Sequence, residues 1–372
     1  MSSSPVSPAA PAQPYGRPPL RTVQVLGGAA GAGSCAHVRS LATGLAARGV
    51  GVTVCAPVRA EGKYDFTGAG ADFAPDAVSV LRAACAGADV VHAHGVRAGA
   101  RALLALRGRR VPLVVSWHGD GPAADGALGR LSRMLERHVA RAAAVVLGPS
   151  SDQVDLARLR GARDARLSPV AVAVSAAAAV SEPGKVRAEL GAVERPLLIA
   201  VGSLVPHRGY SVLLDAAREW RTLDPAPLLV IAGEGPLRAE LSRRIEAEAL
   251  PVRLLGRRRD AARLLAAADV AVLPSRWEAR APLAQAALRA GVALVATAVG
   301  GVPELVGEGA VLVPPGDAGA LASAVTGLLT DPDRRAVLAA AGLAQAGSWP
   351  SEDDTVAQVL SVYDELMERS RR

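Results

Sequence analysis

The stretch Ser275 to Gly291 reads SRWEARAPLAQAALRAG and lies between two short apolar runs, Val270 to Leu273 and Val292 to Ala296. Apolar runs of this length indicate buried strands, and the stretch between them has the pattern of a polar loop followed by a helix. This order is the repeating unit of a parallel sheet, in which the loops at the carboxyl ends of the strands form ligand sites. Because the loop contains the carboxylate of Glu278, the sequence predicts a ligand site here.

The same alternation extends along most of the chain. Further apolar runs occur at 23–26, 52–55, 90–91, 111–115, 197–201, 228–232 and 252–255, with helical patterns between them. That order predicts an α/β fold whose parallel sheets are covered by helices on both faces. Since 372 residues exceed what one core usually holds, we expect two Rossmann-like, doubly wound domains that face each other across a cleft.

Composition breaks suggest the domain boundaries. We expect a disordered tail at 1–20, an N-terminal domain at 21–190, a C-terminal domain at 191–349 and a final helix at 350–372. The tail is rich in Pro, Ser and Ala and lacks the basic start and apolar core of a signal peptide. In the final helix Val356, Val359, Tyr363 and Leu366 share one face, which needs a surface to pack on.

The charge balance limits the partners. The net charge is +7, and Lys63 and Lys185 are the only lysines, so the excess is almost entirely arginine. Such a balance suits nucleic acid, an anionic membrane surface or phosphorylated ligands. Because only 3% of the residues are aromatic and the arginines are scattered, we expect no nucleic-acid partner.

Membrane and disulfide signals are weak. No uncharged apolar run reaches the roughly 18 residues that a spanning helix needs. The three cysteines, Cys35, Cys55 and Cys85, are an odd number at wide spacing, which disfavours a disulfide framework and a zinc site. These features predict a cytoplasmic protein.

The glycine-rich loop at 27–34, GGAAGAGS, has two interpretations. Glycines after a first strand can bring backbone close to a dinucleotide phosphate. A dinucleotide site also needs an acidic residue at the end of the second strand, where the sequence has Cys55, Ala56 and Pro57. A tight turn or a loop that admits a substrate is therefore favoured, and an NAD-dependent dehydrogenase is the weaker alternative.

Three histidines, His92, His94 and His118, lie near predicted strand ends. They could be metal ligands or proton-transfer groups. No carboxylate or cysteine recurs with them at ligand spacing, so we predict no metal site and assign His118 to substrate contact. On the predicted helix at 128–143, His138 lies beside the apolar face and is expected to pack in the core.

The motifs carry a family resemblance. VHAHG, SWHG, VGSLVPHRG, AGEGP, LLGRRRD, PSRWEA, ALRAGVALVATAVGGVPELV, VLVPPGD and SWPSED resemble the retaining glycosyltransferases of family 4, which have the GT-B fold. The resemblance covers about Arg21 to Leu366 and is most specific in the second half. It implies that the N-terminal domain receives an acceptor, the C-terminal domain binds a nucleotide-diphosphate sugar, and the last helix crosses back onto the first domain.

The resemblance also implies residue roles. Arg208, at the position of the family's lysine, would stabilise the diphosphate, Glu278 would hold sugar hydroxyls, and His118 would contact the sugar from the acceptor side. The donor-binding residues would be Gly27, Gly28, Ser203, Gly233, Gly256, Ala281, Leu283 and Ala286. Neither a metal nor a cofactor is implied, because the nucleotide sugar is a co-substrate.

Two positions depart from the family pattern. Ser203 stands in place of an arginine, and Ala286 replaces the second of two glutamates eight residues apart. Neighbours could compensate: Arg257, Arg280 or His207 for the cation, and Glu304 or Glu234 for the carboxylate.

Two functions therefore stay open. The first is transfer of a sugar, with retention of anomeric configuration, to an unidentified lipid-linked or saccharide acceptor. The alternative is a non-catalytic relative that acts as a binding protein. The basic balance also suits peripheral contact at the inner membrane face, although we recognise no strongly amphipathic basic helix in the first domain.

Overall fold

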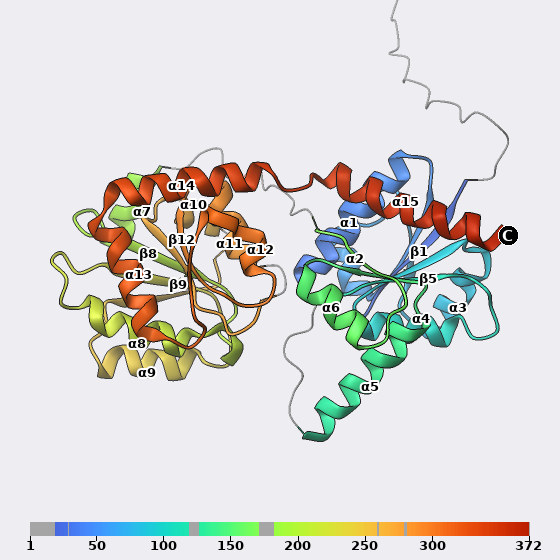
Figure 1. Ribbon diagram of the computed structural model, residues 1–372, viewed down its shortest axis with the longest axis horizontal. Helices are drawn as coiled ribbons and strands as arrows, with labels where there is room; N and C mark the ends of the chain where they lie inside the picture. Colours follow the sequence, from blue (N-terminus) through green and yellow to red (C-terminus); the bar gives the residue numbers. More distant parts are fainter. Residues whose placement is uncertain are drawn as a thin grey trace, which may run out of the picture.

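A computed structural model of the chain describes residues 19–28, 30–118, 126–170, 182–258, 260–278 and 281–371. They form two parallel sheets, each flanked by helices, with a last helix that links the two halves (Figure 1). Apart from its last two residues, the predicted tail at 1–20 lies outside the described residues.

The first half contains a seven-stranded parallel sheet with the strand order β3-β2-β1-β4-β5-β6-β7. Its strands are β1 (Arg21–Leu26), β2 (Gly51–Ala56), β3 (Asp72–Pro75), β4 (Val90–His94), β5 (Leu113–Ser116), β6 (Val145–Gly148) and β7 (Ala165–Leu167). The connecting helices are α1 (Ala32–Ala47), α2 (Val58–Tyr64), α3 (Val78–Ala84), the short η1 (Cys85–Gly87), α4 (Val96–Ala105), α5 (Gly126–Ala142) and α6 (Ser151–Leu159). The strand order reverses between β1 and β4.

The second half repeats the design with six parallel strands in the order β10-β9-β8-β11-β12-β13. They are β8 (Leu197–Val201), β9 (Leu228–Ala232), β10 (Val252–Gly256), β11 (Val270–Leu273), β12 (Ala293–Thr297) and β13 (Val311–Val313). The helices are α7 (Pro183–Leu190), η3 (Pro206–Arg208), α8 (Tyr210–Trp220), α9 (Arg238–Ala247), α10 (Ala261–Ala266), α11 (Pro282–Arg289), α12 (Val302–Val306), η4 (Gly307–Gly309), α13 (Ala318–Thr330) and α14 (Pro332–Gly347). Here the order reverses between β8 and β11.

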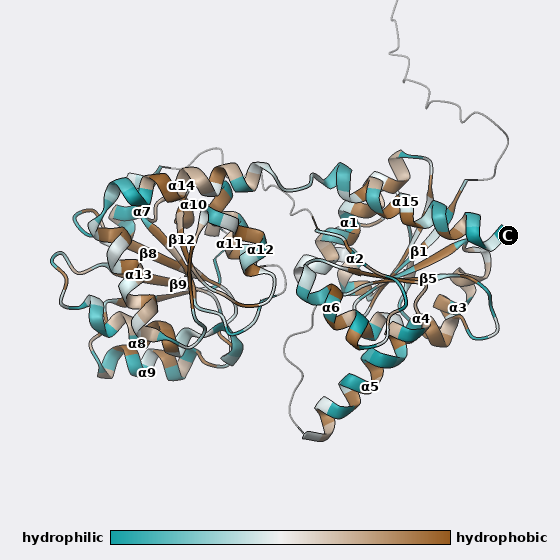
Figure 2. Cartoon of the chain, viewed as in Figure 1, coloured by the Kyte–Doolittle hydropathy of each residue, from teal (hydrophilic) through white to brown (hydrophobic). Residues whose placement is uncertain are grey.

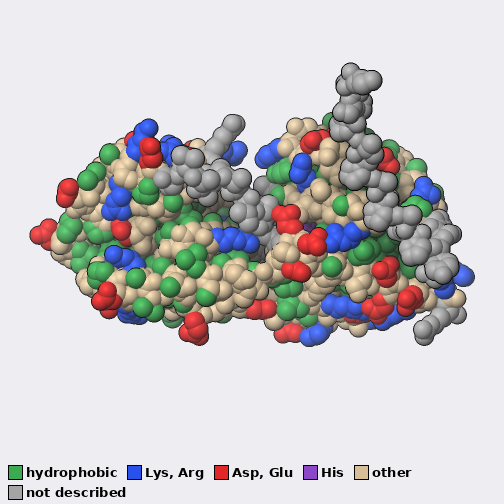
Figure 3. Space-filling view, turned by 90° about the horizontal axis from the view of Figure 1, so that it is seen from above, with side chains coloured by type: hydrophobic (Ala, Val, Ile, Leu, Met, Phe, Trp, Pro, Cys, Tyr) green, Lys and Arg blue, Asp and Glu red, His purple; other side chains and the backbone are tan. Residues whose placement is uncertain are grey.

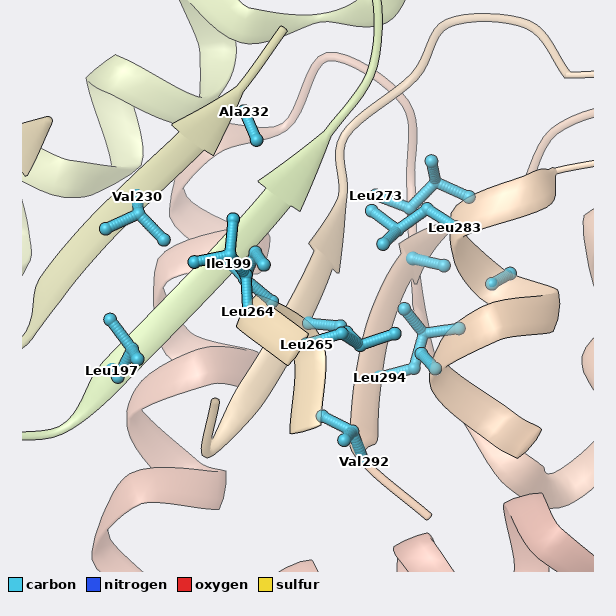
Figure 4. Packing of buried hydrophobic residues seen from close by; sticks show 14 of the residues in the cluster. Leu197, Ile199, Val230, Ala232, Leu264, Leu265, Leu273, Leu283, Val292 and Leu294 are labelled. Carbon is cyan, nitrogen blue, oxygen red and sulfur yellow. The ribbon is translucent and has the colours of Figure 1, made fainter. Parts of the chain in front are cut away.

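Each sheet separates two apolar layers, as the continuous apolar runs predict. Along β8, Leu197 and Ile199 pack on one face while Leu198 and Ala200 pack on the other. Figure 2 shows the apolar strands inside and the more polar helix faces outside, and Figure 4 shows one of these layers from close by. The predicted doubly wound α/β fold is confirmed.

The last helix, α15 (Glu352–Arg371), lies on the first half rather than on the second, from which the chain arrives (Figure 1). Its buried face includes Val356, Val359 and Tyr363, which join the core that α1 forms with the sheet. Gly44 of α1 allows the close approach, because a Cβ there would lie 2.5 Å from a methyl group of Val356. The expected packing surface for this helix therefore exists.

Helix α7 corrects the expected domain boundary. Val186 and Leu190 pack with Leu197 and Leu228 in the core of the second half. The boundary that we expected after residue 190 therefore falls one helix too late.

Helix α5 differs from the sequence prediction. Leu128 and Leu131 are 74% and 62% exposed, and His138 is exposed rather than packed in the core. Gly129, Val139 and Ala140 are the buried residues of the helix, and the last two join the core that α4 forms with the sheet. The apolar spacing correctly predicted a helix, but its apolar face is covered only toward the end, at Leu135 and Val139.

The three cysteines are buried free thiols, and no helix among the described residues is long and apolar enough to cross a membrane.

Candidate active site

The two reversals in strand order determine where a ligand can reach the sheets. In an open parallel sheet the helices on either side of such a reversal lie on opposite faces, which leaves a crevice at the carboxyl ends of the two strands. In the first half this crevice is bordered by Gly27 and His94, and in the second half by the loops at 202–209 and 274–278.

An ion pair stands at the reversal in the second half. The guanidinium of Arg208, after β8, contacts Oε1 of Glu278, after β11. The Ser275 hydroxyl donates to the same carboxylate oxygen at 2.8 Å. Glu278 is only 3% exposed and Arg208 is 23% exposed, so the pair is held in a mostly dry environment. The structure thus brings together two residues that the sequence assigned to separate tasks.

Close packing of the surrounding loops explains several glycines. A Cβ on Gly209 would collide with the carbonyl oxygen of Pro274, and one on Gly233 would collide with that of Gly202. Gly209 also has a φ of +72°, which other residues rarely adopt. Larger residues at these positions would push apart the loops that hold Arg208 beside Glu278.

The pair changes the electrostatics of its neighbours. Burial, and then the charge of Arg208, lowers the pKa of His207, so this side chain is neutral at pH 7. Burial raises the pKa of Tyr210. The Nε of Arg208 is buried and has no hydrogen-bond partner among the described residues. A buried unsatisfied N–H of this kind costs about 1–3 kcal/mol, which an arriving acceptor can relieve if the side chain adjusts.

The remaining residues that were predicted to bind the donor differ in exposure and packing. Ser203 and Ala286 are exposed, so neither side chain is occupied with packing. Pro282 occupies the first turn of α11, where its missing N–H is tolerated, and Ala281 before it has a φ of +39°. Leu283 packs beside Leu273 in the core (Figure 4), so any donor contact it makes would come from its backbone.

The side chains that could replace the family's missing arginine and glutamate differ in whether they already have a partner. Glu304 is engaged, because it accepts from the N–H of Ser151 at 2.8 Å. Glu234 pairs with Arg238 at 3.0 Å on an exposed surface, and a Cβ added to Gly256 would lie 2.9 Å from it. Arg257 is exposed, and Arg280 lies outside the described residues.

The Glu304 contact also joins the two halves. Ser151 begins α6 of the first half, and Glu304 lies on α12 of the second. The surface is indented between the halves, and acidic and basic side chains stand on its edges (Figure 3). Gly300 lies beside the carbonyl of Glu278 and also close to Asp152 of α6. The first half therefore contacts the second half close to the ion pair.

On the first half, a small cavity of about 40 Å³ contains two of the predicted site residues. Gly27 and His118 line it together with His94, Gly95 and Ser34. Gly28 is exposed and its carbonyl accepts from Arg59 at 2.5 Å. His92, by contrast, is fully buried between Tyr363 and Ser116 and is not among the residues that line this cavity.

Three buried histidines, His37, His94 and His118, lie close enough to suggest a metal site. The nearest nitrogens of His94 and His118 are 3.2 Å apart, while their ring centroids are 5.5 Å apart and their planes differ by 10°. The centroid distance exceeds the nitrogen distance by 5.5 minus 3.2 Å, which is about twice the distance from an imidazole centroid to its own nitrogen. The two nitrogens therefore lie on the line between the two ring centroids, so the rings point at each other end to end. This geometry fits an N–H···N hydrogen bond between the two rings.

Comparisons with known proteins agree with this arrangement. Residues 184–345 match the family model described as glycosyl transferases group 1, and residues 32–173 match the model described as a glycosyl transferase 4-like domain. An alpha-D-kanosaminyltransferase from Streptomyces kanamyceticus is 30% identical over 266 residues, which cover 66% of this chain and 69% of that protein. The chain belongs to the group 1 glycosyltransferases of the GT-B fold.

One further relative and one solved structure resemble the chain over most of its length. D-inositol 3-phosphate glycosyltransferase 1 from Catenulispora acidiphila is 30% identical over 310 residues, or 76% of this chain and 73% of that protein. The crystal structure of HepE from Anabaena, in complex with UDP and glucose, matches with a TM-score of 0.79 at 19% identity and covers 93% of this chain and 100% of that one.

Sequence reasoning missed several residues of this glycosyltransferase site. Ser275 was quoted in the decisive stretch but was given no role, and Gln24, whose amide oxygen accepts from His94 of the cavity lining, was treated as a strand residue. A polar residue inside an otherwise apolar strand was the available signal for Gln24, because buried amides need partners.

Proposed function

We propose that this glycosyltransferase moves a sugar from a nucleotide-diphosphate donor to an acceptor with retention of anomeric configuration. In this reaction the bond between the anomeric carbon and the diphosphate oxygen breaks, the acceptor hydroxyl gives its proton to the leaving diphosphate, and the acceptor oxygen bonds to the same face of that carbon. Negative charge then develops on the diphosphate, so catalysis requires a cation that is already in place. No metal is part of the proposal.

The observation that carries the proposal is the Arg208–Glu278 pair. An arginine has five N–H donors in a fixed fork, so Arg208 can keep Glu278 and still bind phosphate oxygens. Its unsatisfied Nε–H indicates that the ligand-free arrangement leaves a donor unused. Glu278, as a buried carboxylate, would accept hydrogen bonds from sugar hydroxyls while it fixes the guanidinium.

Calorimetry tests the donor site. We expect binding of one or more of UDP, GDP and ADP, and we expect Arg208→Ala to abolish it, because the diphosphate then loses its cation. In the opposite direction, Ala286→Glu is expected to tighten binding about threefold to tenfold, since a carboxylate there could accept from a ribose hydroxyl, worth about 0.5–1.5 kcal/mol. Ala286 is exposed, so the substitution disturbs no packing.

The alternative, a non-catalytic binding protein, gives a different pattern. It is motivated by Ser203 and Ala286, which remove two contacts that the family pattern provides. Nucleotide binding that survives Arg208→Ala, or that Ala286→Glu weakens, would contradict the proposed donor site.

Peripheral contact with an anionic membrane surface, on the cytoplasmic side, is the second part of the proposal. Helix α5 projects from the first half (Figure 1) and exposes Leu131 and Met134 to 62% and 65%. Arg130, Arg137 and Arg141 are also exposed on this helix. Apolar side chains beside arginines are the pattern of helices that lie in the membrane interface. The expectation that the first domain lacks a strongly amphipathic basic helix is wrong, because α5 is one.

A cavity of about 810 Å³ at the end of α5 supports the same partner. Its lining includes Arg109, Arg141, Arg163 and Arg369, with Asp164 as the one acidic residue. The Nε of Arg109 is buried and lacks a partner among the described residues. A lipid phosphate beside the helix would neutralise this excess of positive charge.

Vesicle sedimentation tests the membrane contact. We expect the protein to bind phosphatidylglycerol vesicles but not phosphatidylcholine vesicles, and the double substitution Leu131→Ser, Met134→Ser to weaken binding at least tenfold. The matched control is Val337→Ser, Leu343→Ser, which alters two exposed apolar residues of α14 in the second half. Equal losses in both variants, or binding that ignores lipid charge, would contradict a role for α5.

A further inference from the structure

A hydrogen bond crosses between the two halves of the molecule where α6 meets α12. The backbone N–H of Ser151, the first residue of α6, donates to Oε2 of Glu304 on α12 at 2.8 Å. The first four N–H groups of a helix have no partner inside the helix, so they need an acceptor from elsewhere. The hydroxyl of Ser150, just before α6, is not that acceptor, and it donates to Asp152 at 2.5 Å instead. A carboxylate of the second half therefore caps a helix of the first half.

On the second half, the loop before α12 fixes Glu304 relative to the donor site. Gly300 in this loop has a φ of +51°, and a Cβ on it would lie 2.2 Å from the carbonyl oxygen of Glu278. At the start of the same loop, the buried hydroxyl of Thr297 donates to the backbone carbonyl of Ser275. Two contacts thus tie the loop that leads into α12 to the loop that carries Glu278, so the two loops move together.

On the first half, α6 begins at the same sheet edge as the cavity that contains His118. All strands of this sheet are parallel, so the carboxyl ends of β1, β4, β5 and β6 lie at one edge. Gly27 and His118 line the cavity there, and α6 follows β6. A Cβ on Gly148, the last residue of β6, would lie 2.9 Å from the side chain of Val154, so α6 packs tightly on the strand. A force on the start of α6 therefore acts on the acceptor side of the proposed site.

The strength of the contact suits a joint that forms and breaks. The N-terminus of a helix carries partial positive charge, so a carboxylate beside it is stabilising. Ser151 and Glu304 are both exposed, so water competes for the contact. A cap of this kind favours the joined arrangement by about threefold to tenfold.

We propose that Glu304 is a positioning residue that holds the first half against the second and so sets the separation between the donor and acceptor sides of the site. The part that this contact plays in transfer rests on the proposed function. Without the cap the two sheet edges separate more often, and an acceptor oxygen spends less time within reach of the anomeric carbon.

The substitution Ser151→Pro removes the donor of this hydrogen bond and little else. Proline lacks an N–H and is tolerated at the first position of a helix. The residue before a proline must be extended, and Ser150 already is, with a φ of −153° and a ψ of 161°. Ser151 is exposed, so the proline ring enters no packed core.

The matched control is Val78→Pro, at the first residue of α3. Ala77 before it is also extended, with a φ of −67° and a ψ of 138°, and Val78 is exposed. Helix α3 lies on the side of the first half that faces away from the second half (Figure 1). This variant introduces the same residue at the same helical position without access to α12.

Pulsed EPR distances between two spin labels test the contact without any substrate. Leu159→Cys in the first half and Val337→Cys in the second place the labels at exposed positions. The three native cysteines are buried, which raises the pKa of their thiols, so the exposed cysteines react first. We expect a narrow distance distribution that becomes broader or longer in both Ser151→Pro and Glu304→Ala. Unchanged distances in these variants, or the same change in Val78→Pro, would overturn the inference.

Kinetics and calorimetry separate positioning from ribose binding, which the sequence suggested as a compensating role for Glu304. Ser151→Pro and Glu304→Ala should both lower kcat/KM about threefold to tenfold and leave the Kd for the nucleotide unchanged, because the donor site lies within the second half. Glu304→Gln keeps an acceptor oxygen and should recover most of kcat/KM, and Val78→Pro should match the unmodified protein. Weaker nucleotide binding in Glu304→Ala but not in Ser151→Pro would assign Glu304 to the ribose and overturn the positioning role.

The distance readout also separates this inference from the proposed function. If the distances change as expected but no variant, nor the unmodified protein, transfers sugar, the proposed function fails and the joint between the halves stands. If sugar is transferred and Ser151→Pro changes neither the rate nor the distances, the positioning role fails and the proposed function stands.

Discussion

Replacing Glu278 by glutamine is expected to lower kcat about 10²- to 10³-fold with little change in fold. Glutamine keeps the size of the side chain and an oxygen that can accept from Ser275, but it removes the charge that holds Arg208. The loss of a preorganised charge at a developing anion typically has this magnitude. Steady-state rates with the best donor, measured beside thermal unfolding of the same preparation, check the prediction.

The control for Glu278→Gln is a double-mutant cycle with Arg208→Ala. If the two side chains act as one unit, as their direct contact indicates, the double variant should be scarcely less active than either single variant. Fully additive losses would mean that the ion pair is incidental and that each residue acts alone.

Replacing Gly209 by alanine is expected to cost about 2–5 kcal/mol of stability in the second half. A positive φ costs an alanine about 1–2 kcal/mol, and the collision of its Cβ with the Pro274 carbonyl adds about 1–3 kcal/mol of overpacking. The displaced loop also carries Arg208, so nucleotide binding should weaken together with stability. Urea unfolding and calorimetry on the same sample measure both quantities.

The matched control for Gly209→Ala is Gly191→Ala. Gly191 has a similar φ of +64°, but no heavy atom lies within 4 Å of the position that its Cβ would occupy. It should therefore lose only the about 1–2 kcal/mol of backbone strain and keep its nucleotide affinity. Equal effects at the two positions would contradict the idea that loop-to-loop packing holds the site together.

The sequence predicted the fold well because the apolar runs are strong local signals. Short runs such as Leu197 to Val201 and Val270 to Leu273 identify parallel strands without knowledge of their neighbours, and both became strands of the second sheet. Boundaries were harder, since α7 follows a break in composition but packs with the core that comes after it. Which core a helix joins depends on contacts that its own spacing does not contain.

Site residues were less predictable because their contacts are distant in sequence. Arg208 and Glu278 are 70 residues apart, and no local pattern shows that they touch. Gln24 and Tyr363 are separated by 339 residues and meet only because α15 crosses back. The apolar face of α5 had the periodicity of a packed helix, and only its exposure in the structure points to a different partner.

The two family departures have clear positions in the fold. Ser203 and Ala286 are both exposed, so their exchange for a cation and a carboxylate would be tolerated by packing. Under the proposed function, the absence of the family's arginine and second glutamate removes contacts to the donor and leaves the ion pair intact. The structure is therefore compatible with a weakened donor site that is still organised around Arg208 and Glu278.

The central claim, that the chain transfers sugar from a nucleotide-diphosphate donor, is tested most directly by a panel of UDP-, GDP- and ADP-sugars with saccharide and lipid-linked acceptors. Release of the nucleoside diphosphate is measured, and the anomeric configuration of the product is determined by NMR. The account predicts turnover, or at least slow donor hydrolysis, with one nucleotide class, retention in the product, and loss of both activities in Arg208→Ala. Nucleotide binding with neither transfer nor hydrolysis for any donor would contradict it.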